Sequence, residues 1–304
     1  MNIERRSYQL NKLNYVEIKA LFDKKIFEDG KVDLIEKLSK YPSRYVGLFR
    51  PTKPYTKMIQ NITQSHEIKF GGAFELLIRK CFELYGYTCL GRDYTLSNDD
   101  KVNFDQLFSK NERVIFIEQK VRDDHDSTKK RGQMENFEKK LNFLIEKGYK
   151  NISSYIYFID PDLSKNKNYY AAEIEKFKVF YNTKIDLCYG DELFIKENMD
   201  GLWSDEIISF LRRWRDELPN LPEINFDINP QETFDEIKDL PIPVFRGLFD
   251  NEDVVKLIFP IIFPNKTSLK LLLDYFEKQS ISNIRQAPLY EGLLRKLTAA
   301  MQAY

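Results

Sequence analysis

The chain has 304 residues, of which 42% are hydrophobic and 14% aromatic, and this composition indicates one large or two modest globular domains rather than a disordered chain. Lysine plus arginine and aspartate plus glutamate number 47 each, so the overall charge does not indicate a nucleic-acid partner, and a DNA-binding surface must come from local clustering. The three cysteines form no CxxC pair and there are only two histidines, which argues against structural zinc, a His-rich metal site and an HNH-type nuclease centre.

The N-terminal region, residues 1–65, begins without the apolar segment of a secretory signal, and no part of the chain has about 18 uninterrupted apolar residues. We therefore expect a cytoplasmic protein without a membrane span. Short helices separated by turns are predicted at 15–22, 32–38 and 55–62. A longer helix is predicted from about His66, because apolar residues then recur at three- and four-residue spacing until Gly86, a typical helix stop.

Strands and helices alternate in the middle of the chain. Segments rich in β-branched and aromatic residues predict strands at 87–90, 102–107, 113–120, 155–159 and 184–189, and helices are predicted at 128–147 and 204–217. This succession of strands and helices is typical of an α/β (α+β) fold with a mixed central sheet flanked by helices. Three prolines near residue 220 mark a linker, so we predict a core at 66–220 and a mainly helical C-terminal region at 221–304.

Glu118, Gln119 and Lys120 end an apolar strand segment and are the most informative group of residues. Because side chains alternate along a strand, Glu118 and Lys120 share one face of the sheet while Gln119 points to the other. If Asp105, thirteen positions earlier, ends a neighbouring strand, its carboxylate joins Glu118 in an oxygen-rich pocket suited to Mg²⁺. The spacing recurs elsewhere, mostly in predicted helices, where positions i and i+2 do not face each other. The alternative is an exposed ion pair at a strand end.

These residues resemble the motif of the PD-(D/E)XK nuclease superfamily, and specifically that of the type II restriction endonucleases. The resemblance implies a restriction-endonuclease-like core in which Asp105, Glu118 and the carbonyl of Gln119 bind Mg²⁺. It also implies that Lys120 orients or helps to deprotonate the attacking water and stabilises the transition state, and that a homodimer cuts both strands of double-stranded DNA at a specific sequence. Two departures are Phe104 in the place of proline and a polar residue, Gln119, where the motif is usually apolar.

Other acidic residues and a histidine are weaker candidates for the same site. Glu75, on the helix before the sheet, resembles an accessory catalytic carboxylate, and its alternative is a solvated helix residue. Asp99 and Asp100 compete with Asp105 for the first acidic position, but they lie in a turn-type cluster where aspartate is expected anyway. His125 lies in a loop of aspartates and is expected to be solvated rather than catalytic, because a metal-activated water does not need a histidine base.

The segment after the motif strand is the predicted DNA-binding region. Residues 120–150 contain nine lysines and arginines against six aspartates and glutamates. Phosphate contacts are expected from Lys129, Lys130 and Arg131 near a helix N-terminus. Bidentate side chains that could read bases are Arg122, Gln133 and Asn136. The alternative is an ordinary solvated loop, with Ser127 or Thr128 as the N-cap of the helix.

Two other functions stay open at this point. A DNA repair or junction-resolving nuclease could use the same core with structural rather than sequence specificity. A catalytically silent DNA-binding protein could retain the fold, although intact Asp105, Glu118 and Lys120 argue against it. The C-terminal region carries no motif, and its helices around 269–276 and 289–297 have the apolar spacing expected of partner-facing helices.

Overall fold

The computed structural model describes residues 13–95, 100–124, 126–181 and 183–304. The chain forms two compact units: unit 1 comprises Met1–Lys25 and Phe70–Leu218, and unit 2 comprises Ile26–Lys69 and Pro219–Tyr304. Each unit is thus built from two separate stretches of sequence, and the three-region division of the chain stays a prediction. Within the described ranges, no helix has both the length and the apolar character needed to cross a membrane.

A mixed five-stranded sheet forms the centre of unit 1, in the strand order β1-β4-β5-β6-β7. Its strands are β1 (Thr88–Cys89), β4 (Gln106–Lys110), β5 (Arg113–Lys120), β6 (Ile152–Phe158) and β7 (Lys184–Tyr189). Neighbours are antiparallel from β1 to β5 and parallel from β5 to β7. A separate antiparallel pair is formed by β2 (Asp93–Thr95) and β3 (Lys101–Asn103). The predicted mixed sheet is confirmed.

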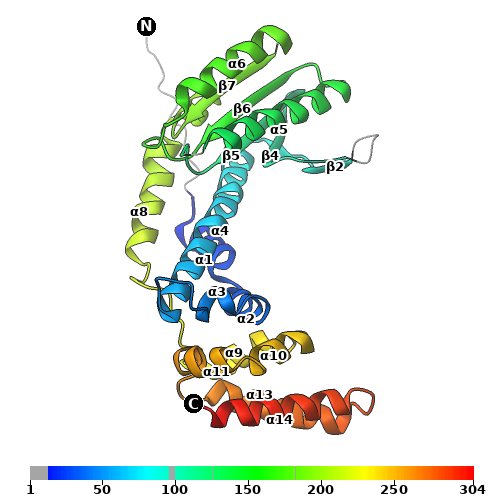
Figure 1. Cartoon of the computed structure of the whole chain (residues 1–304). Coiled ribbons are helices and arrows are strands. Elements are labelled where there is room, and N and C mark those ends of the chain that lie inside the picture. Colours follow the sequence, from blue (N-terminus) through cyan, green and yellow to red (C-terminus); the bar gives the residue numbers. More distant parts are fainter. Residues whose placement is uncertain (1–12, 96–99, 125, 182) are drawn as a thin grey trace. The chain divides into compact units, whose positions relative to one another are not determined.

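Helices cover both faces of this sheet (Figure 1). On one face, α5 (Ser127–Glu146) and α6 (Lys167–Tyr181) share an apolar core with strand residues such as Phe116. On the other face, Phe82 of α4 (Pro54–Leu84) stacks on Phe108 of β4 with ring centroids 4.4 Å apart. The remaining helical elements with residues in unit 1 are α1 (Tyr15–Phe27), α7 (Glu192–Lys196), the π-helical turn η1 (Leu202–Ile207) and α8 (Ile208–Asp216).

Helix α4 (Pro54–Leu84) is one continuous helix, although the sequence predicted two helices with a break near His66. Pro54 begins the helix, where its missing N–H costs no hydrogen bond. The helix continues through Gly71 and Gly72, which weaken helix propensity but permit close packing. A Cβ atom on Gly72 would lie only 2.9 Å from Cε of Lys25, so the glycine allows the two chain segments to approach.

The predicted strand at 102–107 is wrong, because two strands divide this segment. β3 ends at Asn103 and β4 begins at Gln106, and the chain bends between them. Phe104 occupies the bend and is fully buried, with its ring centroid 5.1 Å from that of Phe116. The burial of this large ring stabilises a change of direction that the apolar pattern alone did not indicate. Asp105 therefore lies directly before a strand rather than at the end of one.

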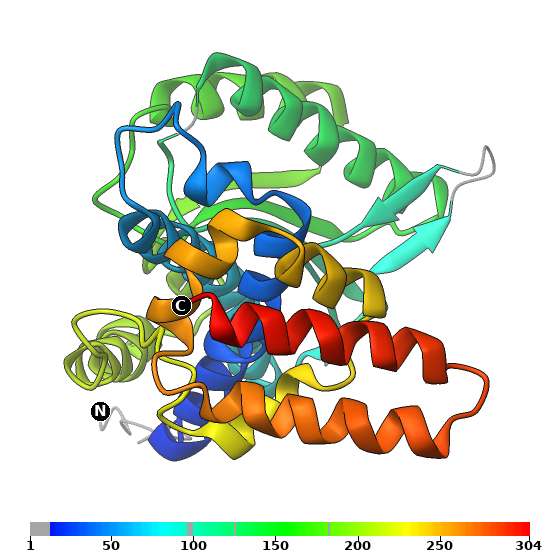
Figure 2. The same ribbon diagram turned by 60° about the horizontal axis from the view of Figure 1, so that its bottom comes forward.

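Unit 2 is a helical unit around its own apolar core. Its helices are α2 (Gly30–Lys40), α3 (Ser43–Val46), α9 (Pro230–Ile237), α10 (Ile242–Phe249), α11 (Glu252–Leu257), α12 (Phe259–Ile262), α13 (Thr267–Ser282) and α14 (Ala287–Gln302), joined by the first part of α4. Helices α13 and α14 run side by side (Figure 2). Leu272 and Leu297, from the two helices predicted to face a partner, are buried in this core.

Candidate active site

Glu118 and Lys120 lie on the same face of β5, at the end of the strand. Val114 and Phe116, earlier on this face, are buried under α5, and Phe116 stacks on Phe137 with centroids 5.0 Å apart. The apolar residues of β5 pack in the core, so the two charged residues that follow them lie where the strand leaves the core. The Glu118 side chain is only 4% exposed, whereas that of Lys120 is 28% exposed. The end of β5 therefore holds a buried carboxylate beside an ammonium group that solvent can reach.

Asp105 is brought to the same place by the pairing of β4 with β5. The two strands are antiparallel, with Gln106 opposite Ile117, so the beginning of β4 lies beside the end of β5. The expectation that Asp105 ends a strand is wrong. Antiparallel pairing nevertheless places Asp105 near Glu118, as expected. The backbone N–H of Gln119 donates a 2.9 Å hydrogen bond to Oδ2 of Asp105. This bond holds the Asp105 carboxylate against the end of β5.

Three oxygen atoms converge on the ammonium group of Lys120. Its Nζ lies 2.9 Å from Oδ2 of Asp105, from Oε1 of Glu118 and from the carbonyl oxygen of Gln119. Burial lowers the pKa of Lys120, but the negative charges of Glu118 and Asp105 outweigh burial, and the pKa is raised above its ordinary value. Lys120 is therefore an ammonium group at the centre of an oxygen cluster.

The same three oxygens have the chemistry of a site for a hard divalent cation. Two carboxylates and a backbone carbonyl are oxygen donors that Mg²⁺ accepts, and Mg²⁺ commonly takes only one or two protein carboxylates and keeps several waters. All three oxygens lie 2.9 Å from Nζ of Lys120, so they are close enough together to hold such an ion once the ammonium group moves aside. In the described part of the chain, no group of three or more histidine, cysteine, aspartate or glutamate side chains offers an all-side-chain metal site.

A second lysine, Lys140, lies beside Glu118 and was missed by the sequence reasoning. It comes from α5, its side chain is 3% exposed, and its Nζ lies 2.5 Å from Oε2 of Glu118. The ammonium is also 3.9 Å from Oδ1 of Asp105. A signal for it existed, because position 140 falls between Phe137 and Leu144 on the buried face of the helix. A lysine in an apolar stripe needs a buried partner, and Glu118 is that partner.

Glu75 is connected to the site through an arginine that the sequence reasoning also missed. Arg92 Nη1 donates a 2.6 Å hydrogen bond to Oε2 of Glu75 and a 3.0 Å hydrogen bond to the carbonyl oxygen of Asp105. The backbone oxygen of Glu75 accepts a further bond, 2.6 Å long, from Nε2 of Gln106. In this arrangement Glu75 braces the turn that carries Asp105, while its accessory catalytic role stays a prediction.

The predicted DNA-binding residues divide into two groups. Arg122, Lys129 and Arg131 are exposed around the N-terminus of α5. Arg131 also donates a 3.3 Å hydrogen bond from Nε to the carbonyl oxygen of Ser127. In the second group, Lys130 Nζ lies 3.3 Å from Oδ1 of Asn166, Gln133 accepts a hydrogen bond from the hydroxyl of Tyr170, and Asn136 Nδ2 lies 3.4 Å from Oε1 of Glu118. Asn136 thus reaches the oxygen cluster itself. The role of all six in DNA binding stays a prediction.

The N-cap of α5 is Asp126, so the prediction of Ser127 or Thr128 is wrong. The Asp126 carboxylate accepts hydrogen bonds from the backbone N–H groups of Thr128 and Lys129, at 3.1 and 2.9 Å. Aspartate is as good an N-cap as serine, and its charge also suits the positive end of the helix. The rival acidic candidate Asp100 forms an ion pair with Lys139 at 2.9 Å, while Asp99 and His125 lie outside the described residues.

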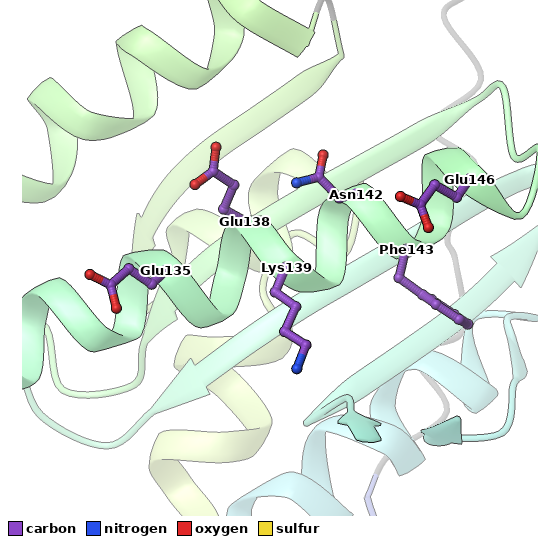
Figure 3. Close-up of a pocket in the computed structure, with 6 residues that line it drawn as sticks. All are labelled: Glu135, Glu138, Lys139, Asn142, Phe143 and Glu146. Atoms are coloured by element: carbon purple, nitrogen blue, oxygen red, sulfur yellow. The ribbon is translucent and has the colours of Figure 1, made fainter. Parts of the chain in front are cut away.

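A shallow hollow of about 290 Å³ lies along the outer side of α5 and is separate from the oxygen cluster. Its lining comes entirely from this helix: Glu135, Glu138, Lys139, Asn142, Phe143 and Glu146 (Figure 3). Three carboxylates against one ammonium disfavour the approach of a phosphate backbone. The cations of α5 that suit DNA are therefore those near the start of the helix.

Comparison with known families agrees with this geometry. Residues 87–215 match the family model described as type II restriction endonuclease, HinfI. The resemblance to PD-(D/E)XK restriction endonucleases is confirmed. The matched span contains all the strands of the central sheet together with Asp105, Glu118, Lys120 and Lys140, whereas Glu75 and unit 2 lie outside it. No curated protein and no solved structure gives a significant match.

Proposed function

We propose that this protein is a type II restriction endonuclease that hydrolyses phosphodiester bonds of double-stranded DNA at a specific sequence, with Mg²⁺ as its cofactor. The observation that carries the proposal is the oxygen cluster of Asp105, Glu118 and Gln119 around Lys120, at the end of a strand within the restriction endonuclease match. A carboxylate just before β4, together with a carboxylate and an amine at the end of β5, is the set of groups that the resemblance to this nuclease type implies.

The oxygen cluster would hold the metal ion through Asp105, Glu118 and the backbone carbonyl of Gln119. When bound, Mg²⁺ lowers the pKa of water and neutralises negative charge that builds on the phosphate. Lys120 is an ammonium group that solvent reaches, and once the metal ion takes the three oxygens its Nζ would be available to donate hydrogen bonds to a phosphate oxygen or to the attacking water. Asp105 keeps its orientation through the N–H of Gln119, which leaves its carboxylate directed at the same point.

The DNA backbone is proposed to pass the N-terminal end of α5. Lys129 and Arg131 are exposed there, and the free N–H groups of a helix N-terminus favour anions. Asp126 already occupies the N–H groups of Thr128 and Lys129, so phosphate contacts would come mainly from side chains. The acidic outer side of α5 stays turned away from DNA in this arrangement.

Incubation of the purified protein with phage DNA and Mg²⁺, followed by sequencing of the fragment ends, tests the activity and its specificity together. We expect discrete fragments that share a common sequence at their ends. Glu118→Ala and Lys120→Ala should each abolish this cleavage, because each removes one group of the cluster, whereas the matched control Lys139→Ala on the outer side of α5 should cleave normally. Retained cutting by either cluster variant would reject the assignment.

The same experiment separates the alternative functions. Cleavage restricted to branched or damaged DNA would identify a repair or junction-resolving nuclease instead. DNA binding without cleavage at any divalent metal concentration would identify a catalytically silent DNA-binding protein.

A homodimer is part of the proposal, because two symmetry-related centres are the simplest way to cut both strands of a palindromic site. Light scattering during size-exclusion chromatography should give twice the mass of one 36.2 kDa chain, with or without DNA. A monomer that nicks one strand at a time would contradict this part of the proposal and leave the cleavage chemistry intact.

A further inference from the structure

Lys140 is a buried charge that the proposed chemistry does not use. Its side chain is 3% exposed, and it lies on the face of α5 that carries Phe137, Leu141 and Leu144 into the core. A lysine is rarely buried this completely without a partner, because removing an ammonium group from water is costly. Glu118, itself 4% exposed, is the partner at 2.5 Å. An apolar side chain at position 140 would fill the same helix face without that cost.

The two lysines of the site contact different oxygen atoms of the same two carboxylates. Lys120 lies 2.9 Å from Oε1 of Glu118 and from Oδ2 of Asp105. Lys140 lies 2.5 Å from Oε2 of Glu118 and 3.9 Å from Oδ1 of Asp105. The cluster therefore contains two negative groups, Glu118 and Asp105, and two positive groups, Lys120 and Lys140. The two lysines neutralise the carboxylates through different oxygen atoms.

This balance has a direct electrostatic consequence for a cation that binds the cluster. A divalent ion held by Oε1 of Glu118 would feel the ammonium of Lys140 across a single carboxylate group, in a place that little solvent reaches. Repulsion between like charges is much less screened there than at the surface. Lys120 has room to move toward solvent, because its side chain is 28% exposed, whereas the Lys140 side chain is only 3% exposed.

We infer that Lys140 sets the divalent-cation affinity of the site, by neutralising Glu118 from the protein side and so weakening the hold of the oxygen cluster on the ion. The inference rests on the proposed function, since it takes the cluster to be a metal centre. Lys140 is accordingly a positioning and tuning residue that acts through Glu118 rather than on DNA.

The test is titration of the DNA-free protein with Mn²⁺, followed by electron paramagnetic resonance of the free ion. Lys140→Met and Lys140→Gln remove the charge, Lys140→Arg keeps it, and Lys139→Met removes a charge from the next, more exposed position of the same helix. We expect the Met and Gln variants to bind Mn²⁺ about tenfold more tightly than the wild type. The Arg variant and the Lys139 control should bind as the wild type does.

The direction of the change makes the result decisive. Structural damage to a metal site weakens binding, so tighter binding cannot come from a poorly folded variant. Two substitutions of different polarity keep the test usable if one of them fails to fold, which thermal unfolding in EDTA would reveal. Unchanged or weaker Mn²⁺ binding in folded Met and Gln variants would overturn the inference.

Glu118→Gln separates this inference from the proposed function. If Glu118→Gln binds Mn²⁺ as tightly as the wild type does, the cluster is not the metal centre and the proposed function itself is wrong. If Glu118→Gln loses Mn²⁺ binding while Lys140→Met leaves it unchanged, only the role given to Lys140 is wrong.

Discussion

Strand β5 has a buried glutamate cluster at each of its ends, and the two clusters differ in one decisive respect. At the start of the strand, Arg113 donates to Glu197, which also accepts hydrogen bonds from the hydroxyls of Tyr87 and Tyr155. At the end of the strand, the carboxylate of Glu118 lies between Lys120 and Lys140. Both clusters satisfy a buried carboxylate, but they contain different numbers of charges.

The two clusters differ in how closed they are and in how many carboxylates they contain. Glu197 is a single carboxylate, fully buried, with three donors from three separate parts of unit 1, and nothing in that arrangement calls for another ion. The Glu118 cluster adds Asp105, which is 16% exposed, and an accessible lysine. A closed cluster stabilises the fold, whereas an open cluster with a second carboxylate can exchange a protein cation for a metal ion.

The same substitution at both ends of β5, Glu118→Gln and Glu197→Gln, should affect the two clusters differently. We expect Glu118→Gln to lower the DNA cleavage rate about a thousandfold, because the proposed metal ligand loses its charge. Glu197→Gln should keep most of the cleavage rate but lower the free energy of unfolding by about 2 kcal/mol, since it weakens charge-assisted hydrogen bonds. Plasmid cleavage and urea unfolding measure the two effects.

The reverse pattern would remove the distinction between the clusters. A stable Glu197→Gln variant without cleavage activity would mean that the cluster at the start of β5 takes part in cleavage. A fully active Glu118→Gln variant would mean that the cluster at the end of β5 does not.

Arg113→Met tests whether the start of β5 is a closed structural cluster. The Glu197 side chain is 0% exposed, so loss of Arg113 leaves a buried carboxylate supported only by two tyrosine hydroxyls. We expect a loss of about 3 kcal/mol in the free energy of unfolding, as is common when one partner of a buried pair is removed. Urea unfolding in EDTA gives the value. A decrease in the free energy of unfolding below about 0.5 kcal/mol is typical of surface ion pairs. Such a small decrease would mean that the Arg113–Glu197 pair stabilises the fold no more than an exposed ion pair does.

Arg92→Met tests how far the open cluster depends on its support. Arg92 bridges Glu75 and the backbone oxygen of Asp105, so its removal should misplace the Asp105 carboxylate. We expect the cleavage rate at saturating DNA to fall about tenfold, because small misplacements of catalytic groups are costly. Single-turnover cleavage measures the rate. If DNA affinity in Ca²⁺ falls and the saturated rate does not, Arg92 contacts DNA instead of supporting Asp105.

The smallest expected effect concerns pH at the start of β5. Burial and the hydrogen bond to Glu197 raise the pKa of both Tyr87 and Tyr155 above the ordinary value of 10.0. In the unfolded chain these hydroxyls ionise first, so their contribution is complete below pH 10 and is lost as the pH rises further. At about pH 10.5, each hydroxyl should contribute about 0.8 kcal/mol less to the free energy of unfolding than it does well below pH 10.

Comparison with Tyr87→Phe isolates this contribution, because other tyrosines titrate in both proteins. Urea unfolding of the two proteins between pH 8 and 10.5 should show the smaller pH dependence in Tyr87→Phe. Equal pH dependence would show that the hydroxyl of Tyr87 keeps its ordinary pKa in the folded protein.

Much of the candidate site was predictable from local pattern. The apolar run before Glu118 and the two-residue alternation of a strand place Glu118 and Lys120 on one face without any knowledge of the fold. Strands β5 and β7 have the predicted bounds, because their ends coincide with turn residues or with a change in polarity. The bend at Phe104 was not predictable, because burial of that ring depends on residues from three other segments.

Local sequence is enough to place Glu118 and Lys120 together at the end of a strand, since alternation along a strand depends on neighbouring residues. The groups around them come from the folding of distant segments. Antiparallel pairing places Asp105 beside Glu118, and packing of α5 on the sheet places Lys140 there, 22 positions away in sequence. Both depend on contacts between distant segments, which the packing of the whole core selects and which no local pattern specifies.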